Sequence, residues 1–249
     1  MKTTSRTQSM LLACSVAASG AAFGATSFTD AFTGGASANW DNPAAADYTN
    51  NDAAFQGADG NNRTYLRTTA ADYNTVDFVA TIDLTRGNGS GGSGCSFFGI
   101  GNGEGTASAP PYWGEPTSGE AILIRLNTNG WSSRLGDIYQ NYSATGFTDP
   151  NNAVAADTPL SIQMTYVAAT GTATFVLDTD GNGFDGSDPT YSQSNTNLTP
   201  TTSRIFFGGS YGTTGGSVGD NFSVTIIPEP SSAALLALGG LALLRRRRG

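Results

Sequence analysis

The chain has 249 residues, of which 33 are glycine and 13% are charged, and it contains no histidine. Without histidine there is no Ser-His-Asp or Cys-His relay, no His-ligated zinc and no imidazole base near neutral pH. The net charge of −8 also argues against nucleic acid as a partner, because phosphates are neutralised by lysine and arginine. Any catalysis would therefore depend on carboxylates, tyrosine or a metal held by oxygen ligands.

Residues 1–25 have the features of a secretory signal peptide. Lys2 and Arg6 provide the positive start, residues 10–22 form an apolar stretch, and Ala22-Phe23-Gly24 is a small-x-small cleavage site. The alternative is a first helix of the folded domain. The signal interpretation predicts export through the secretory translocon and removal of the segment by signal peptidase.

The opposite end, residues 228–249, has three distinct parts. The motif Pro228, Glu229 and Pro230 comes first, an apolar run over residues 233–244 follows, and the basic cluster is Arg245, Arg246, Arg247 and Arg248. As a helix, residues 231–244 would rise about 21 Å, which is shorter than a hydrocarbon core of about 30 Å. The arginines would hold the tail on the cytoplasmic side of the membrane while the body lies outside.

This tail resembles the PEP-CTERM sorting signal of bacterial surface and exopolysaccharide-associated proteins. The resemblance covers residues 228–249 and includes the Pro-Glu-Pro motif, the apolar segment and the basic cluster. It implies recognition by a membrane-embedded, exosortase-type transpeptidase, which would cut near the motif and either release the body or transfer it to an extracellular acceptor. The expected destination is the cell surface or the extracellular matrix. A plain C-terminal membrane anchor is the alternative, since stop-transfer sequences share the basic end.

Residues 26–227 remain as one predicted domain. Its only basic residues are six arginines, which together with nineteen acidic residues give a net charge of −13. Such a charge favours solubility and attracts cations. Cys95 is the only cysteine of this segment, so an internal disulfide is excluded. We interpret Cys95 as a small apolar residue.

Alternation of apolar and polar residues predicts strands throughout the body. The alternation is clearest over residues 75–84, 160–167 and 222–226. Further strands are predicted for residues 27–32, 63–67, 96–100, 120–126, 172–178 and 203–207. Stretches rich in Gly, Asn and Ser, such as residues 87–94, are typical of the turns between them. We expect about nine to twelve strands in a single antiparallel β-sandwich of the all-β class, with no helix in the body.

The two ends of the body resemble concanavalin A-like lectin and glucanase jelly rolls. The resemblance rests on Phe28-Thr29-Asp30-Ala31-Phe32 leading to Trp40, and on Gly219-Asp220-Asn221-Phe222-Ser223-Val224. It implies a jelly roll in which the first and last strands pair.

Residues 178–188 carry the sharpest local motif. Oxygen-bearing side chains alternate at its start and Gly183 permits a bend, as in the first half of a calcium loop. The candidate calcium ligands are Asp178, Asp180, Asn182 and Asp185. The pattern departs from a calcium loop at Pro189, where a bidentate glutamate is expected, and its flanks are predicted strands. The alternative is a long hairpin loop built on Asp-Gly and Asn-Gly turns.

Carboxylate catalysis is not supported by the spacing of the acidic residues. Glu104, Glu115 and Glu120 are the only glutamates of the body, and none lies in the Glu-x-Asp-x-x-Glu or Glu-x-Asp-x-Glu pattern of jelly-roll glucanases. Asp77 and Asp83 share one face of a predicted strand, which is typical of a solvated face. We therefore identify no catalytic residue.

Aromatic residues in the long connections offer a second kind of site. Tyr112, Trp113 and Trp131 have rings that can stack on sugars, and binding groups are often found in such connections. The alternative is that these rings are packing anchors.

These observations predict an exported, non-enzymatic protein of the cell surface or of an exopolysaccharide matrix. A carbohydrate-binding, lectin-like module with calcium in the 178–188 loop is the first alternative. A divergent polysaccharide-degrading enzyme is the second.

Overall fold

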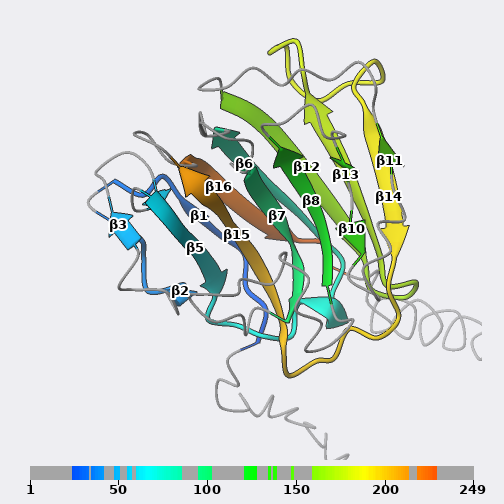
Figure 1. Ribbon diagram of the computed structural model, residues 1–249. Coiled ribbons are helices and arrows are strands. Elements are labelled where there is room, and N and C mark those ends of the chain that lie inside the picture. Colours follow the sequence, from blue (N-terminus) through cyan, green and yellow to red (C-terminus); the bar gives the residue numbers. More distant parts are fainter. Residues whose placement is uncertain are drawn as a thin grey trace, which may run out of the picture.

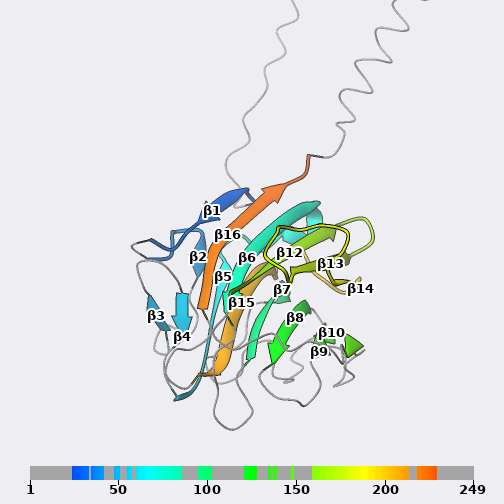
Figure 2. The ribbon, with the colours of Figure 1, turned by 90° about the horizontal axis from the view of Figure 1, so that it is seen from above.

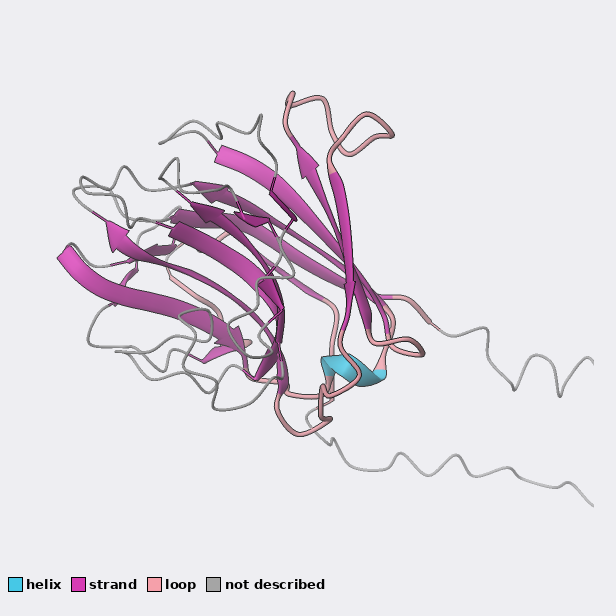
Figure 3. Cartoon of the chain, turned by 45° about the vertical axis from the view of Figure 1, so that its right-hand side comes forward, coloured by secondary structure: helices cyan, strands magenta, loops and turns pink. Residues whose placement is uncertain are grey.

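The computed structural model describes the body of the chain in separate ranges. These are residues 24–33, 35–41, 48–50, 55–57, 60–85, 95–102, 121–127, 134–135, 137–138, 147–148, 159–212 and 218–228. Over these residues the chain is almost entirely β-structure, and the single helical element is the 3-10 turn η2 (Tyr73–Thr75), coloured cyan in Figure 3.

Two antiparallel sheets form the two layers of the molecule (Figures 1 and 2). The eight-stranded sheet has the order β14 (Thr190–Ser194), β13 (Thr172–Asp178), β12 (Pro159–Val167), β6 (Phe78–Thr85), β16 (Val218–Ile226), β4 (Phe55–Gly57) and β3 (Tyr48–Asn50), with β1 (Phe28–Asp30) also paired to β16. The six-stranded sheet has the order β10 (Asp137–Ile138), β8 (Ala121–Asn127), β7 (Cys95–Asn102), β15 (Ser203–Gly212), β5 (Gly60–Thr68) and β2 (Trp40–Asp41). A separate pair joins β11 (Phe147–Thr148) to β9 (Arg134–Leu135).

The main core lies between the two sheets and is filled by alternate residues of their strands. On β6 and β12 every second side chain is buried, including Phe78, Ile82 and Met164. The opposing strands contribute Phe98 and Phe207, which are also fully buried. This alternation is the period-two pattern of the sequence, and it confirms the predicted antiparallel sandwich.

The first and last strands lie side by side, as Figure 2 shows. Phe28 pairs with Val224 and Asp30 with Phe222, so β1 covers the second half of β16 while β4 covers its beginning. The hydroxyl of Ser27 also accepts a hydrogen bond from the backbone N–H of Ile226, at 2.8 Å. The pairing of the terminal strands, which the jelly-roll resemblance implied, is thus confirmed.

The structure corrects the predicted strand boundaries and number. Strand β6 begins at Phe78 and not at residue 75, because the chain before it forms η2. Strand β1 ends at Asp30, because Phe32 has a positive φ of 52°. The described residues form sixteen strands where we expected about nine to twelve. Most of the additional strands are only two or three residues long, too short to show an alternating pattern.

Candidate functional site

Residues 178–188 form the loop of a hairpin between β13 and β14. Val176 pairs with Thr190, and the N–H of Leu177 donates to the carbonyl of Pro189 at 3.1 Å. The predicted hairpin is therefore present. It joins two strands at the edge of the eight-stranded sheet, and most of its residues are exposed, whereas Asp188 is buried.

Asp178 organises the first half of this loop. Its two carboxylate oxygens accept the N–H groups of Gly181 at 2.7 Å and Gly183 at 3.0 Å. Both glycines have positive φ, 76° and 94°, a conformation that other residues rarely adopt. The shape of the turn therefore favours glycine at positions 181 and 183.

Asp188 organises the second half of the loop from a buried position. Its carboxylate accepts the N–H of Asp185 at 2.9 Å and the N–H of Thr179 at 3.4 Å, and the residue is only 8% exposed. One carboxylate thus ties the beginning of the loop to its end. Burying a charged carboxylate costs free energy, and a nearby cation would reduce that cost.

Asp178, Asp180 and Asp188 bring their carboxylates together, with one oxygen of each lying within 4.8 Å of the others. Three carboxylates in this arrangement suit a hard divalent cation that prefers oxygen ligands, such as calcium. The chain contains no lysine or arginine between Arg134 and Arg204, so no basic residue of the flanking sequence is at hand to neutralise them. The residues present therefore fit a calcium ion.

The structure adds Asp188 to the candidate ligands and gives the predicted ones different surroundings. Asp180 lies in the cluster, while Asn182 donates its side-chain N–H to Asp180 at 2.9 Å. Asp185 points its carboxylate at Ser187, accepting the hydroxyl at 2.6 Å and the N–H at 2.7 Å. These bonds lower the pKa of Asp185 below its ordinary value. Asp188 belongs to the carboxylate cluster, but the spacing of a calcium loop does not predict it as a ligand. It lies one residue before Pro189, the position where such a loop has its glutamate.

Asp77 and Asp83, which were considered as catalytic carboxylates, form hydrogen bonds to neighbouring residues of the fold. Asp83 accepts the hydroxyl of Ser161 at 2.6 Å and the side-chain N–H of Asn221 at 2.9 Å. Asp77 accepts the N–H of Ala168 at 2.8 Å. Both carboxylates connect neighbouring segments of the eight-stranded sheet.

The three aromatic candidates, Tyr112, Trp113 and Trp131, lie outside the described residues, as do Glu104, Glu115 and Glu120. Tyr112 and Trp113 belong to the connection between β7 and β8, and these two strands show where that connection is attached. Gly101 pairs with Ala121, so the connection that carries Tyr112 and Trp113 leaves and rejoins the six-stranded sheet at one end of β7 and β8.

The six-stranded sheet is buried on both faces. Phe98 and Phe207 belong to the core between the sheets, whereas Phe97, Leu123 and Phe206 occupy the opposite face and are also fully buried. The rings of Phe97 and Phe206 lie 6.0 Å apart. The outer face of this sheet is therefore apolar and buried at these three positions, which sequence alternation alone does not predict.

The first residue of the predicted sorting motif, Pro228, lies just after the end of β16. The N–H of Ile227 donates to the carbonyl of Asp77 at 2.8 Å, and Pro228 is the last described residue. Several residues of the predicted terminal signals lie outside the described residues: residues 1–23 of the predicted signal peptide, and Glu229, Pro230, Arg245, Arg246, Arg247 and Arg248 of the predicted sorting tail. In the part of the chain that is described, no helix has the length and apolar character to span a membrane.

Comparison with known proteins relates the fold to lectins. No family model and no curated protein matches the chain. Among solved structures, lectin II from Ulex europaeus is 14% identical, with a TM-score of 0.56 over 82% of this chain and 99% of the lectin. A Lotus tetragonolobus seed lectin is 16% identical, with a TM-score of 0.56 over 82% of this chain and 100% of its own.

A third solved structure, the exoplasmic/lumenal domain of VIP36 in a Ca2+/Man-bound form, is 12% identical and has a TM-score of 0.51 over 78% of this chain and 85% of that domain. At these identities the likeness concerns the fold alone. The body is a concanavalin A-like jelly roll, as the terminal segments of the sequence implied.

Proposed function

We propose that this protein is an exported, non-enzymatic carbohydrate-binding protein of lectin type, presented at the cell surface or in an exopolysaccharide matrix. The observation that carries the proposal is the lectin sandwich, which extends over 82% of this chain and nearly the whole length of several lectins. Asp83 and Asp77 form local hydrogen bonds at the eight-stranded sheet, which favours binding over hydrolysis. Tyr112, Trp113 and Trp131 are the proposed sugar-stacking residues.

A glycan array probed with the purified full-length protein in a mild detergent tests the binding function. We expect selective binding to one class of glycans, and reduced binding when Trp113 is changed to alanine. Absence of binding to every glycan, in calcium-containing buffer, would contradict the proposal. Cleavage of any bound polysaccharide would favour the polysaccharide-degrading alternative.

We further propose that calcium binds Asp178, Asp180 and Asp188. The support is the convergence of their oxygens within 4.8 Å and the all-oxygen character of the donor set. A bound calcium ion would supply positive charge to these three carboxylates. The ion would fix the turn between β13 and β14, and Asn182 and Asp185 would support the loop through their own hydrogen bonds.

Thermal unfolding in calcium or in a chelator tests this site. A ligand at one hundred times its Kd stabilises a folded protein by about 2.7 kcal/mol, so a clear rise in Tm is expected with calcium. The variants Asp180→Asn and Asp188→Asn should lose that rise. Asp220→Asn, on the same sheet but outside the loop, is the matched control and should keep it. An equal rise in all four proteins would assign calcium elsewhere.

Export and sorting complete the proposal. The resemblance of residues 228–249 to a sorting signal supports processing by an exosortase-type enzyme, and Pro228 directly follows the last hydrogen-bonded residue of the body. Intact-mass measurement of the protein recovered from the cell exterior is the test. We expect a form that begins near residue 25 and lacks residues 233–248. A mature form that retains those residues would instead favour the plain membrane anchor.

A further inference from the structure

Two large apolar side chains are exposed among the described residues, and both lie at the same end of the eight-stranded sheet. Val167 is 38% exposed at the end of β12, and Ile227 is 43% exposed directly after β16. Strand register brings them near each other, because Phe78 at the start of β6 pairs with both Tyr166 and Ile226. The residues that follow these two partners therefore lie on either side of the segment that leads into β6.

Asp77 connects these segments at the end of the sheet. Its carbonyl accepts the N–H of Ile227 at 2.8 Å, and its carboxylate accepts the N–H of Ala168 at 2.8 Å. Val76 and Ala168, on the same segments, are partly buried apolar residues. This end of the sheet thus presents a small apolar surface, named here the tail-side surface: Val76, Val167, Ala168 and Ile227.

The predicted sorting tail starts beside the tail-side surface. Pro228 is the last described residue at this end, and residue 231 begins the segment that was considered as a short membrane helix. A fully extended chain covers at most about 3.6 Å per residue, so the two positions are separated by about 11 Å at most. With residues 231–244 in a bilayer, the tail-side surface would lie close to the place where the chain enters the lipid.

The carboxylates of the same sheet gather at its opposite end. Register places Asp220 beside Asp83, and Ser161 between Asp83 and Asp178. Asp83 lies six residues after Asp77, which corresponds to about 20 Å along a strand. The loop after β13 adds Asp180, Asp185 and Asp188. This loop, yellow in Figure 1, extends beyond β13 and β14, whereas η2, cyan in Figure 3, lies at the other end of the sandwich.

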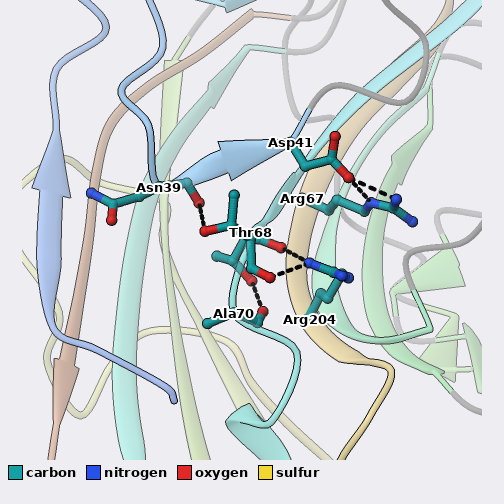
Figure 4. A network of polar contacts seen from close by, with 7 residues as sticks. Asn39, Asp41, Arg67, Thr68, Ala70 and Arg204 are labelled. Atoms are coloured by element: carbon teal, nitrogen blue, oxygen red, sulfur yellow. Dashed lines mark hydrogen bonds and ion pairs between the residues drawn. The ribbon is translucent and has the colours of Figure 1, made fainter. Parts of the chain in front are cut away.

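Two arginines of the six-stranded sheet lie toward the end of the molecule that carries η2, and both are engaged within the fold (Figure 4). Arg204 donates from Nη1 to the carbonyls of Thr68 and Thr69. Arg67 forms an ion pair with Asp41, with Nη2 2.7 Å from Oδ2. A body of net charge −13 is also not attracted to anionic lipid. Contact of this end with a bilayer would therefore depend on apolar side chains and on the tail.

We infer that the tail-side surface rests on the lipid bilayer while residues 231–244 are inserted in it, and that the 178–188 loop points away from the membrane. The inference rests on the proposed sorting function, which requires the tail to reach a membrane-embedded enzyme. Apolar side chains gain free energy when they leave water for the boundary between headgroups and acyl chains. The short connection to the tail gives the surface a high effective concentration at the bilayer, so a small apolar area is sufficient.

Photocrosslinking in vesicles tests this orientation. The full chain is reconstituted into phosphatidylcholine vesicles containing a phospholipid with a diazirine near its headgroup, and the adducts are mapped by proteolysis and mass spectrometry. We expect adducts on residues 231–244 and 167–170, and none on residues 178–188. Because the contact is apolar, the adducts should persist at about 1 M salt, where the Debye length is only about 3 Å.

Matched variants identify the side chains that make the contact. Val167→Thr combined with Ile227→Thr keeps both side chains β-branched but makes them polar. This double variant should lower the adducts on residues 167–170 several-fold and leave those on residues 231–244 unchanged. Val176→Thr is the control, because Val176 lies on β13 one residue from the buried Leu177 and toward the acidic end of the sheet. It should give the wild-type adducts.

The other outcomes separate the inference from the function on which it rests. Adducts on residues 231–244 with none on residues 167–170 would refute the contact and leave tail insertion standing. Adducts on residues 178–188 in place of 167–170 would show the opposite orientation. Absence of adducts on residues 231–244, with the protein remaining outside the vesicle fraction, would remove tail insertion as well. Loss of the 167–170 adducts at high salt would show that the contact is electrostatic and not apolar.

Discussion

At the scale of single residues, Asp30 fixes the segment that follows β1 through three hydrogen bonds. One carboxylate oxygen accepts the N–H of Phe32 at 2.7 Å, and the other accepts the N–H of Ser37 and the indole N–H of Trp40, both at 2.9 Å. Trp40 in turn packs edge-to-face against Phe222 with ring centroids 4.7 Å apart. A single buried carboxylate thus orients the largest aromatic group of the core.

Changing Asp30 to asparagine tests this arrangement. The amide has only one acceptor oxygen, so at least one of the three donors loses its partner in a buried place. Each unsatisfied buried donor costs about 1–3 kcal/mol, and we expect a loss of this size in the free energy of unfolding. Urea denaturation measures it. The exposed-face variant Asp220→Asn should change stability far less, and similar losses in both would argue against the role of Asp30.

Tyr166 makes stability depend on alkaline pH. Burial, and then the charge of Asp77, raise the pKa of this phenol from 10.0 to about 12. Its ring is buried against Phe78, with centroids 5.4 Å apart. Because the folded state has the higher pKa, the stabilisation is complete below pH 10 and is lost as the pH rises from 10 to 12.

Denaturant unfolding measured from pH 9 upward should therefore show a falling stability across that interval, and the fall should be smaller in Tyr166→Phe. It should not vanish, because burial also raises the pKa of Tyr73. An identical pH profile in the variant would show that Tyr166 does not contribute.

At the scale of elements, Gly99 sets the spacing of β7 and β8. A Cβ atom at this position would lie 2.6 Å from the Cβ of Leu123 and 2.8 Å from its Cα, and it would also collide with the carbonyl of Ile122. Backbone atoms in a central strand cannot move aside cheaply. Gly99→Ala should therefore cost about 1–3 kcal/mol of stability, as overpacked cores do.

Gly186→Ala is the matched control for this change. No atom lies within 4 Å of the position of its Cβ, so the substitution should leave the melting temperature nearly unchanged. A loss of Tm in this control equal to that of Gly99→Ala would show that the effect is not due to the packing of the two strands.

The elements also show which local patterns sufficed for prediction. Strand β13 was predicted with its observed boundaries, because Ala173, Phe175 and Leu177 alternate with polar residues and are buried. Strand β14 was not predicted, since it lies at the edge of the sheet and Ser192 and Ser194 face solvent. Its place is determined by pairing with β13, where Ser192 and Thr174 share a hydrogen bond of 2.7 Å between their hydroxyls. That contact is invisible in the local sequence.

At the scale of the whole molecule, the paired β1 and β16 bring the two ends of the body together. Ser27 and Ile226 are joined by a hydrogen bond, so a short linker can connect the ends. A circular permutant with a short linker from Pro228 to Ala25, and new ends between the exposed tip residues Ala169 and Thr170 of the β12–β13 turn, should fold with a similar β-rich circular dichroism spectrum. An insoluble or unfolded permutant would contradict this adjacency in solution.

The sequence alone was sufficient to predict the all-β class, most of the long strands and the hairpin at residues 178–188, because alternation and turn chemistry depend on neighbouring residues. The signal peptide at residues 1–25 and the sorting tail at residues 228–249 remain predictions from composition and motif. The folded structure added what depends on distant residues: the membership of Asp188 in the carboxylate cluster, and the burial of Phe97 and Phe206 on the outer face of the six-stranded sheet. Strand register creates these groups, and register follows from how the entire chain packs.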